Sequence, residues 1–397
     1  MQSLLSTLGA PLATLFAWPI SFAIAAIITF AISLGVCLAI ILTARHHCHL
    51  TSDHLDEVQK IHSGQIPRIG GLAIVIALAY AGSELLAVRK IDLMLLLGLA
   101  ALPAFVFGIL EDLTRRVSVR ARFMATLAAG VVGCYVLEHT LHSVGFESID
   151  AILSYSFIAI VFTAIASAGL ATSINIIDGL NGLSSFISIA ILIGLAALAN
   201  QAGDVDVYKV AILGAVAIAG FAVCNWPLSK IFLGDGGAYF IGFFIAWIAI
   251  LIRSRDGSIS AFAMLLVCAY PVIETLFSMA RRTGFKKLVG APDQKHLHHL
   301  IFFHVKYTLG VPQKWANSVA GLLTALLAIP PIVLALQYPS NKDILIALFA
   351  TFVGLYLALY IFLQKTARIV HVRQMSSSTQ AKAGGGEFGH AVYSYKE

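Results

Sequence analysis

Four acidic residues stand at the ends of long apolar segments, where a carboxylate is unusual. They are Glu111, Asp112, Asp178 and Asp235. A carboxylate at the edge of an apolar environment is costly unless it is paired, hydrated or bound to a cation. Each acid alone could be a hydrated loop residue. Carboxylate oxygens suit Mg²⁺, which takes one or two of them together with substrate phosphates and water. The four acids together therefore predict a metal–phosphate site for Mg²⁺, with Mn²⁺ as an alternative.

Asparagines and glycines accompany two of these acids. Asn175, Asp178 and Asn181 are three residues apart, so in a helix they would point roughly the same way. A capping turn fits the same pattern. Asp235 lies in Gly234-Asp235-Gly236-Gly237, where the free amides of a turn could bind phosphate oxygens. A simple loop would have the same sequence.

A third group consists of histidines and basic residues. His296, His298 and His299 lie within four residues and could carry protons or contact phosphate near neutral pH. A zinc site or a solvated cluster are the alternatives. Lys60 and Arg122 suit phosphate oxygens, although positive charge at the inner side of a membrane protein needs no function.

The composition is typical of a membrane protein. Hydrophobic residues make up 59% of the chain and charged residues 12%, about half of the roughly 25% found in soluble domains. The net charge of +6 does not indicate a nucleic-acid partner, because a membrane protein collects Lys and Arg in its inner loops. The five cysteines form no C-x-x-C pair, which predicts neither a disulfide framework nor a thiol metal site.

The expected fold is an all-α polytopic membrane protein with about eleven transmembrane helices, each of about 20 residues. The first segment is interpreted as a retained helix, because the N-terminus lacks the charged start of a cleavable signal peptide. The eighth is short and glycine-rich, so it could be tilted, broken or partly re-entrant. The ninth contains Glu274, which is either a buried structural acid or a support for the site. The segments cover 15–43, 70–88, 92–110, 123–138, 151–173, 183–200, 208–225, 237–252, 259–280, 315–337 and 342–364.

The charges of the loops predict the orientation. Only six of the 26 Lys and Arg residues lie on the side of the loops after even-numbered segments, in those loops or in the first two residues of the segment that follows. The positive-inside rule therefore places the other loops and the C-terminus in the cytoplasm and the N-terminus outside. All five polar clusters follow odd-numbered segments, which predicts one site at the inner membrane surface. The clusters are 60–71, 108–123, 175–183, 225–237 and 292–299.

The chain is expected to contain one domain and a tail. Residues 1–373 would form a single transmembrane catalytic domain with cytoplasmic active-site loops. Residues 374–397 are rich in Ser and Thr and then in Gly, a composition that predicts a disordered cytoplasmic tail.

Taken in order, the five clusters resemble the motifs of the polyprenyl-phosphate N-acetylhexosamine-1-phosphate transferase family, over about residues 60–300. The family's Asp-Asp pair corresponds to Glu111-Asp112, which keeps both charges but lengthens the first side chain. The family's Asn-x-x-Asp-Gly-x-Asn/Asp-Gly motif begins here at Asn175. Its Gly-Asp motif corresponds to Gly234-Asp235, and the resemblance makes Asp235 a Mg²⁺ ligand, together with Asp178.

The resemblance also implies roles in substrate binding and catalysis. Phe232 would lie against uracil, Asn225 would belong to the uridine pocket, and Arg122 would contact phosphate. The run Pro292-Asp293-x-x-His296-Leu297-His298-His299 resembles the GlcNAc-type branch of the family. The residues expected to bind substrate are Lys60, Arg122, Asn175, Asn181, Asn225, Phe232 and His296, and those expected to be catalytic are Glu111, Asp112, Asp178, His298 and His299.

The implied activity is a Mg²⁺-dependent transfer of N-acetylhexosamine-1-phosphate, in particular GlcNAc-1-phosphate, from a UDP-sugar to undecaprenyl phosphate. UMP would be released and a lipid-linked cell-envelope glycan begun, for the cell wall or the lipopolysaccharide O antigen. The enzyme would lie in the bacterial inner membrane, with a homodimer as one compatible state. The alternatives are a phospho-N-acetylmuramoyl-pentapeptide transferase and, from another class, a transporter of anionic solutes.

Overall fold

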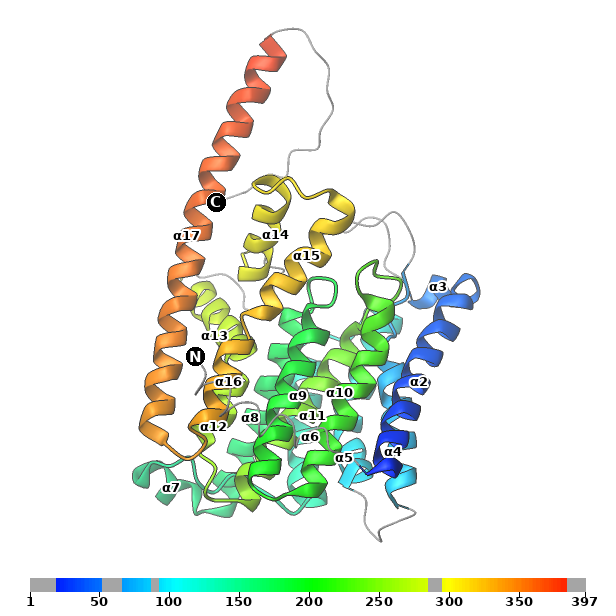
Figure 1. Ribbon diagram of the computed structural model, residues 1–397, viewed down its shortest axis with the longest axis vertical. Helices are drawn as coiled ribbons and strands as arrows, with labels where there is room; N and C mark the ends of the chain where they lie inside the picture. The colour runs from blue at the N-terminus through cyan, green and yellow to red at the C-terminus, as the bar shows by residue number, and fades with distance from the viewer. Residues whose placement is uncertain (1–18, 52–65, 87–92, 285–294, 384–397) are drawn as a thin grey trace.

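The computed structural model describes residues 19–51, 66–86, 93–284 and 295–383, and the elements of these ranges are helices (Figure 1). The first half of the chain contains α2 (Ile20–Leu42), α3 (Ala44–Thr51), α4 (Gly71–Leu86), α5 (Leu93–Thr114), α6 (Val119–Val136), α7 (Glu147–Leu153), α8 (Ser156–Ile177) and α9 (Leu183–Gln201). The second half contains α10 (Val205–Asn225), α11 (Gly234–Arg255), α12 (Ala261–Val267), α13 (Ala269–Gly284), α14 (Leu297–Tyr307), α15 (Gln313–Leu326), α16 (Ile329–Gln337) and α17 (Lys342–Ala383).

The described helices confirm a multi-span helical membrane fold. Nine spans are long and apolar enough to cross a bilayer, or ten if the bent pair α12–α13 counts as one, and α4 is apolar but shorter. Outer helices present large apolar side chains to the surroundings, such as Ile20 on α2 and Phe362 on α17, as lipid contact requires. The expected number of eleven spans is not confirmed by these ranges, and the orientation of the termini stays a prediction.

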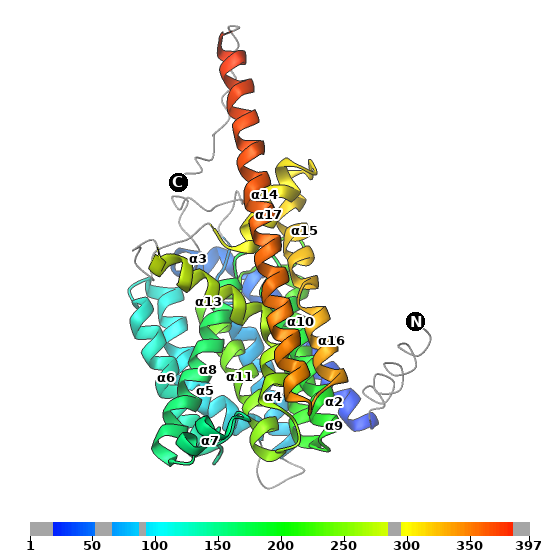
Figure 2. The same ribbon diagram turned by 90° about the vertical axis from the view of Figure 1, so that its left-hand side faces the viewer.

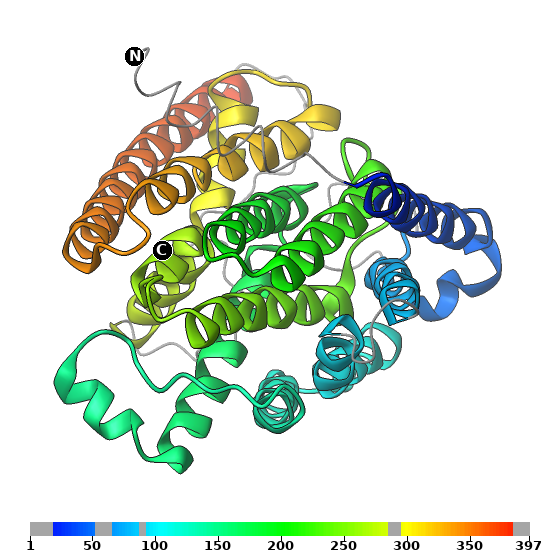
Figure 3. The same ribbon diagram turned by 60° about the horizontal axis from the view of Figure 1, so that its bottom comes forward.

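The glycine-rich eighth segment is the central helix of the bundle rather than a broken one. α11 is a continuous helix of 22 residues, and 94% of its most apolar stretch is buried. Figure 3 shows it between α9 and α10 on one side and α5 and α6 on the other. A Cβ on Gly108 of α5 would lie 2.5 Å from the Cα of Gly236, and a Cβ on Gly242 would lie 2.5 Å from the Cα of Ala171 on α8. The glycines therefore allow close helix packing. Of the alternatives of a tilted, broken or partly re-entrant segment, the broken one was wrong.

The break occurs one segment later. α12 and α13 meet at an angle of 80° around Cys268. α13 then leads towards the end of the bundle at which α14 and α15 lie (Figure 2). The second half of the ninth segment therefore approaches the histidine cluster from below.

The tail also differs from the prediction. α17 continues as a helix to Ala383 and projects beyond the rest of the bundle (Figures 1 and 2). Residues 374–383 continue the helix of the last span where disorder was expected. The backbone hydrogen bonds of a helix are made within the segment itself. Residues 384–397 lie outside the described ranges.

The two ends of the bundle carry different polar chemistry. At the end with α7, Arg255 pairs with Asp204 at 3.1 Å and Arg253 donates to Ser143. Lys342 donates to the carbonyl of Gly145. These basic residues, which fall in the loops with few positive charges, have local partners. The opposite end holds the described parts of all five polar clusters.

Candidate functional site at one end of the bundle

The site is built from helix ends that lie together because their helices pack on one another. Asp112 lies in the last turn of α5, Arg122 in the first turns of α6, and Asp235 in the first turn of α11. Asp178 directly follows α8. α11 contacts α5, α6 and α8, and α6 contacts both α5 and α8, so the structure brings together acids that are up to 123 residues apart.

Asp112 caps the N-terminus of α11. Its Oδ1 accepts from the backbone N–H of Asp235 at 2.8 Å, and its Oδ2 accepts from that of Gly236 at 2.9 Å. Gly234, with φ of 76°, begins the helix, and a Cβ there would meet Asp112 Oδ2 at 2.6 Å. The Gly234–Gly237 segment is therefore the start of a helix, and the prediction of free amides for phosphate was wrong: the amides of Asp235 and Gly236 are bonded to a carboxylate of the protein itself.

The carboxylate of Asp235 lies between two other side chains. Its Oδ1 accepts from Asn175 Nδ2 at 3.0 Å, and its Oδ2 forms an ion pair with Arg122. The guanidinium of Arg122 also lies 5.9 Å from the ring centroid of Tyr239, one turn further along α11. Three residues predicted from separate clusters therefore form one contact group.

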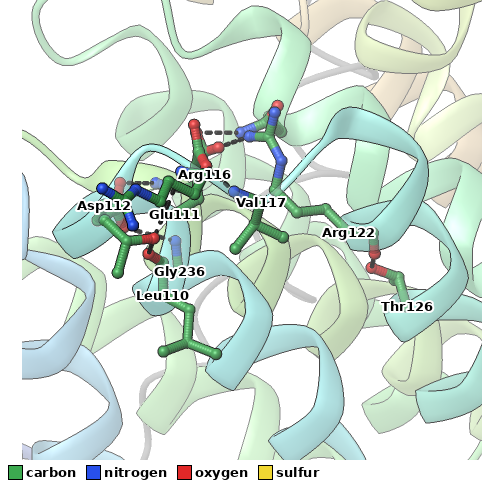
Figure 4. A network of polar contacts seen from close by, with 11 residues as sticks. Leu110, Glu111, Asp112, Arg116, Val117, Arg122, Thr126 and Gly236 are labelled. Carbon is green, nitrogen blue, oxygen red and sulfur yellow. Dashed lines mark hydrogen bonds and ion pairs between the residues drawn. The ribbon is translucent and has the colours of Figure 1, made fainter.

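Glu111 lies beside Asp112 but has a different partner. Its Oε2 accepts from the backbone N–H of Val117 at 2.8 Å, in the turn between α5 and α6 (Figure 4). Figure 4 also shows Arg122 rising from α6 next to this turn. Glu111 thus shapes the connection that carries Arg122, and its catalytic role stays a prediction.

Asp178 lies in a turn rather than in a helix. α8 ends at Ile177, and the carboxylate of Asp178 accepts a short hydrogen bond from Ser184 Oγ. Burial raises the pKa of Asp178 to about 6, although the bond from Ser184 and the positive charge of Arg68 lower it. One carboxylate oxygen is engaged by a side chain, which leaves acceptor capacity for a ligand.

Because α8 ends before Asp178, Asn181 does not share a face with Asn175. The backbone N–H of Asn181 donates to Asn317 Oδ1 at 2.6 Å, and its side-chain Nδ2 donates to Ser318 Oγ at 3.1 Å. The hypothesis of three side chains on one helical face was therefore wrong. The pattern fits the capping turn, and Asn181 fixes that turn against α15.

Asn225 connects two of the loops at this end. Its Oδ1 accepts from the N–H of Gly182 at 2.7 Å, and its Nδ2 donates to the carbonyl of Ile231 at 2.9 Å. Asn225 thereby holds the loop that contains Phe232, which is half-buried and exchanges backbone hydrogen bonds with Pro67 and Gly70. The uridine-pocket roles of Asn225 and Phe232 stay predictions. Lys60 lies outside the described residues.

The three histidines meet above the turn at Asp178. His298 is buried, its ring is stacked on that of His296 at 5.3 Å between centroids, and His299 lies 4.3 Å away. A Cβ on Gly179 would lie 2.7 Å from His298 Nε2, so this glycine leaves the space that His298 fills. Burial, and then the neighbouring His299 and His296, lower the pKa of His298 well below its usual range. These surroundings favour the neutral form of the His298 ring.

Some residues of this end were not predicted. Tyr356 of α17 donates to Glu274 Oε2 at 2.9 Å, and Asn317 and Ser318 of α15 hold the turn at Asn181. Single polar residues within apolar segments gave no spacing signal. No group of three His, Cys, Asp or Glu side chains that could hold a metal occurs within the ranges the structure describes. All five cysteines are buried.

The fold and the site define a multi-span helical membrane protein with a charged site at one end of the bundle. A family model for glycosyl transferase family 4 matches residues 94–253, from α5 to the end of α11. The chain is similar to this family over that range. The matched range contains the contact group and the acids Glu111, Asp112 and Asp178, but not the cluster of His296, His298 and His299.

Relatives in bacteria are similar over most of their length. The chain is 26% identical over 315 residues to the probable undecaprenyl-phosphate N-acetylglucosaminyl 1-phosphate transferase of Bacillus subtilis, covering 78% of this chain and 82% of the relative. It is 28% identical to the undecaprenyl-phosphate alpha-N-acetylglucosaminyl 1-phosphate transferase of Thermotoga maritima, covering 61% and 70%. For the protein of the same name from Yersinia pestis, the identity is 27% and the coverage 68% and 73%.

Proposed function

We propose that this protein transfers GlcNAc-1-phosphate from UDP-GlcNAc to undecaprenyl phosphate and releases UMP. The observation that carries the proposal is the contact group of Asp235, Arg122 and Asn175 beside Asp178 and the histidines, in a family whose similar members are named for this transfer. The product would begin a lipid-linked cell-envelope glycan.

The reaction exchanges one phosphorus–oxygen bond for another. An oxygen of the lipid phosphate attacks the β-phosphorus of the UDP-sugar, and the bond from that phosphorus to the bridging oxygen breaks. UMP leaves with the electron pair. The lipid phosphate needs little help from a base, because its second pKa is about 6. The site must therefore align the two phosphates and neutralise their charge.

The donor atoms of the site fit Mg²⁺. Asp235 and Asp178 supply carboxylate oxygens, and Mg²⁺ typically takes one or two of these with phosphates and water. The carboxylate of Asp235 contacts the side chains of Asn175 and Arg122. These side chains can rotate away from it without moving a helix. When bound, the ion would neutralise the charge that develops on the pyrophosphate.

The basic and histidine side chains would hold phosphate oxygens. Arg122 can form two parallel hydrogen bonds to a phosphate group, and without a ligand its ion pair with Asp235 places it at the site. In the neutral form of His298, one ring nitrogen can donate a hydrogen bond to a phosphate oxygen while the other accepts. Its Nδ1 has no hydrogen-bond partner among the described residues, although it is buried, which supports a role towards a ligand.

The membrane setting is part of the proposal. The site lies at one end of the bundle, where a lipid tail can stay in the bilayer while its phosphate reaches the helix ends. The excess of Lys and Arg in the loops of this end favours the cytoplasmic face of the bacterial inner membrane, where a UDP-sugar would be available.

The test is UMP release by the purified full-length protein in detergent, with UDP-GlcNAc and undecaprenyl phosphate and with mass spectrometry of the lipid product. The expected result is UMP and a lipid carrying one N-acetylhexosamine and two phosphates, only when both substrates and Mg²⁺ or Mn²⁺ are present. Asp235→Asn should abolish turnover. Asp256→Asn, at the opposite end where Asp256 accepts from Ser258, is the matched control and should remain active.

Three outcomes would overturn the proposal. Turnover with UDP-MurNAc-pentapeptide but not with UDP-GlcNAc would indicate the muramoyl-pentapeptide reaction. Movement of an anionic solute into liposomes without UMP release would indicate a transporter. Full activity of Asp235→Asn would remove the acid from the metal site.

A further inference from the structure

Glu274 of α13 is an acid within an apolar segment, and its side chain is completely buried. Its exposed fraction is 0%. A carboxylate in such surroundings costs several kcal/mol unless its oxygens are hydrogen-bonded. The structure gives Glu274 three donors: His296 Nδ1 at 2.9 Å, the backbone N–H of Leu297 at 3.3 Å and the hydroxyl of Tyr356 at 2.9 Å. The acid is therefore satisfied by contacts that all lead to the histidine segment or to α17.

The contact with His296 fixes which nitrogen of that ring carries the proton. Glu274 Oε1 accepts from Nδ1, so Nδ1 carries a proton, and Nε2 is the atom left for another partner. The ring of His296 is then held nearly parallel to that of His298, with an interplanar angle of 7°. His298 in turn fills the space beside Gly179. Glu274 is thus the first member of a chain of contacts that ends at the Asp178 turn.

The same carboxylate oxygen also holds the start of α14. Leu297 is the first residue of that helix, and its N–H is one of the donors that a helix leaves unsatisfied at its N-terminus. An acid beside a helix N-terminus is electrostatically favourable. The orientation of α14 therefore depends on Glu274, and His298 and His299 lie in the first turn of this helix.

α17 supports the arrangement from the other side. α13, α14 and α17 lie together in Figures 1 and 2. Tyr356 holds Glu274 Oε2, and Tyr360 donates to the carbonyl of Lys295 at 3.1 Å. The ring of Phe277 packs against both tyrosines, at 5.6 and 4.6 Å between centroids. The last span thereby fixes which oxygen of Glu274 faces the histidine.

We propose that Glu274, held by Tyr356, is a positioning residue that orients His296 and the start of α14 so that His298 and His299 face the phosphate groups of the substrates. The inference rests on the proposed function for the statement that the histidines contact phosphate. The hydrogen bond between Glu274 and His296 and its effect on the histidine tautomer can be tested without it.

The central variant is Glu274→Gln, in the full-length protein in detergent. The glutamine keeps one acceptor oxygen but loses the charge and places an N–H₂ group next to a donor. We expect kcat to fall roughly 10- to 100-fold, the range known for carboxylates that orient metal-binding histidines. The KM for UDP-GlcNAc should change less than kcat, because the hydrogen bonds of Glu274 lead to the start of α14 and to Tyr356. Glu274→Asp should restore part of kcat.

Two further variants make the result specific. Tyr356→Phe removes one hydrogen bond and should lower kcat roughly 2- to 12-fold, as expected from the net worth of one such bond. Thr275→Val is the matched control. Thr275 is the next residue on α13, it is buried, and its hydroxyl has no hydrogen-bond partner among the described residues. This variant should keep the wild-type kcat.

Nitrogen NMR of ¹⁵N-histidine-labelled protein provides a readout that does not depend on activity. The His296 signal, assigned by its loss in His296→Gln, should show a protonated Nδ1 in the wild type and a changed tautomer balance in Glu274→Gln. The wild-type tautomer in Glu274→Gln would refute the positioning contact. A lowered melting temperature with unchanged kcat would make Glu274 a structural acid. No turnover with any UDP-sugar in the wild type, together with the expected NMR change, would refute the proposed function and leave the contact standing.

Discussion

The capping of α11 by Asp112 leads to a prediction that separates positioning from proton transfer. In Asp112→Asn, the amide keeps one acceptor oxygen, but its nitrogen faces a backbone N–H of Asp235 or Gly236. One of the two bonds, at 2.8 and 2.9 Å, is then lost. A buried amide without a partner costs about 1–3 kcal/mol, and the lost charge at a helix N-terminus costs about 0.3–1 kcal/mol.

We expect Asp112→Asn to be destabilised by roughly 1–4 kcal/mol, the sum of these two terms. Turnover should fall on the order of 100-fold, the effect of a displacement of about 1 Å at a reacting group, because Asp235 lies in the turn that Asp112 holds. The concentration of Mg²⁺ that gives half-maximal activity should rise. The assays are thermal unfolding in detergent and UMP release over a range of Mg²⁺ concentrations.

The matched control is Asp150→Asn at the other end of the bundle. Asp150 also accepts from backbone amides, with 2.7 Å to the N–H of Val144, but it is more exposed. This variant should lose some stability and keep its activity. If Asp112→Asn instead retains the stability of the wild type and loses only kcat, Asp112 acts on the lipid phosphate and the capping argument is wrong.

Three other perturbations test separate parts of the structure. Gly179→Ala should displace His298, whose Nε2 lies 2.7 Å from the added Cβ, and should lower kcat at least tenfold with little change in melting temperature; an unchanged kcat would show that His298 does not need this place. The pKa of Asp178 is raised to about 6 from 3.8, so the folded protein binds more protons than the unfolded chain between these values, and without Mg²⁺ its stability should fall as pH rises through this window. Asp178→Asn should reduce this dependence of stability on pH. An equal dependence in both proteins would show that burial does not raise the pKa of Asp178. Lys295→Cys should react with an impermeant thiol reagent only from the cytoplasmic side and Arg255→Cys only from the outside, with low background because the five native cysteines are buried; reversed labelling would place the site outside.

The fold could be anticipated from the sequence to the extent that hydropathy decides it. Long apolar segments must become helices in a bilayer, because every backbone N–H and C=O needs a partner within its own segment. Hydropathy does not distinguish a helix that contacts lipid from one that contacts protein. Glycines in the eighth segment therefore left a tilted, broken or partly re-entrant helix open, whereas in the structure Gly236 and Gly242 allow α11 to approach α5 and α8 closely.

The candidate site was predictable as a collection of residues but not as a set of contacts. The positive-inside rule predicted that the five clusters lie at one end of the bundle. The structure places Asp235, Arg122 and Asn175 in contact there. The end of α8 was ambiguous, because Asn-x-x-Asp-Gly fits both a helical face and a capping turn. The bond between Glu274 and Tyr356 joins residues 82 positions apart, and nothing in the spacing of the apolar segments specifies such a pair.

The contacts also divide the acids of this end by what their partners can do. Asp112 and Glu111 accept from backbone N–H groups, and these bonds can be exchanged only if a helix end or a turn moves. Asp178 and Asp235 accept from the side chains of Ser184, Asn175 and Arg122, which can rotate to other partners at small cost. An acid that must bind an ion or a phosphate-linked ligand in every turnover has to release its resting partner each time. Asp178 and Asp235 meet that condition, so we propose that these two acids bind the ligand and that Asp112 and Glu111 order the helix ends.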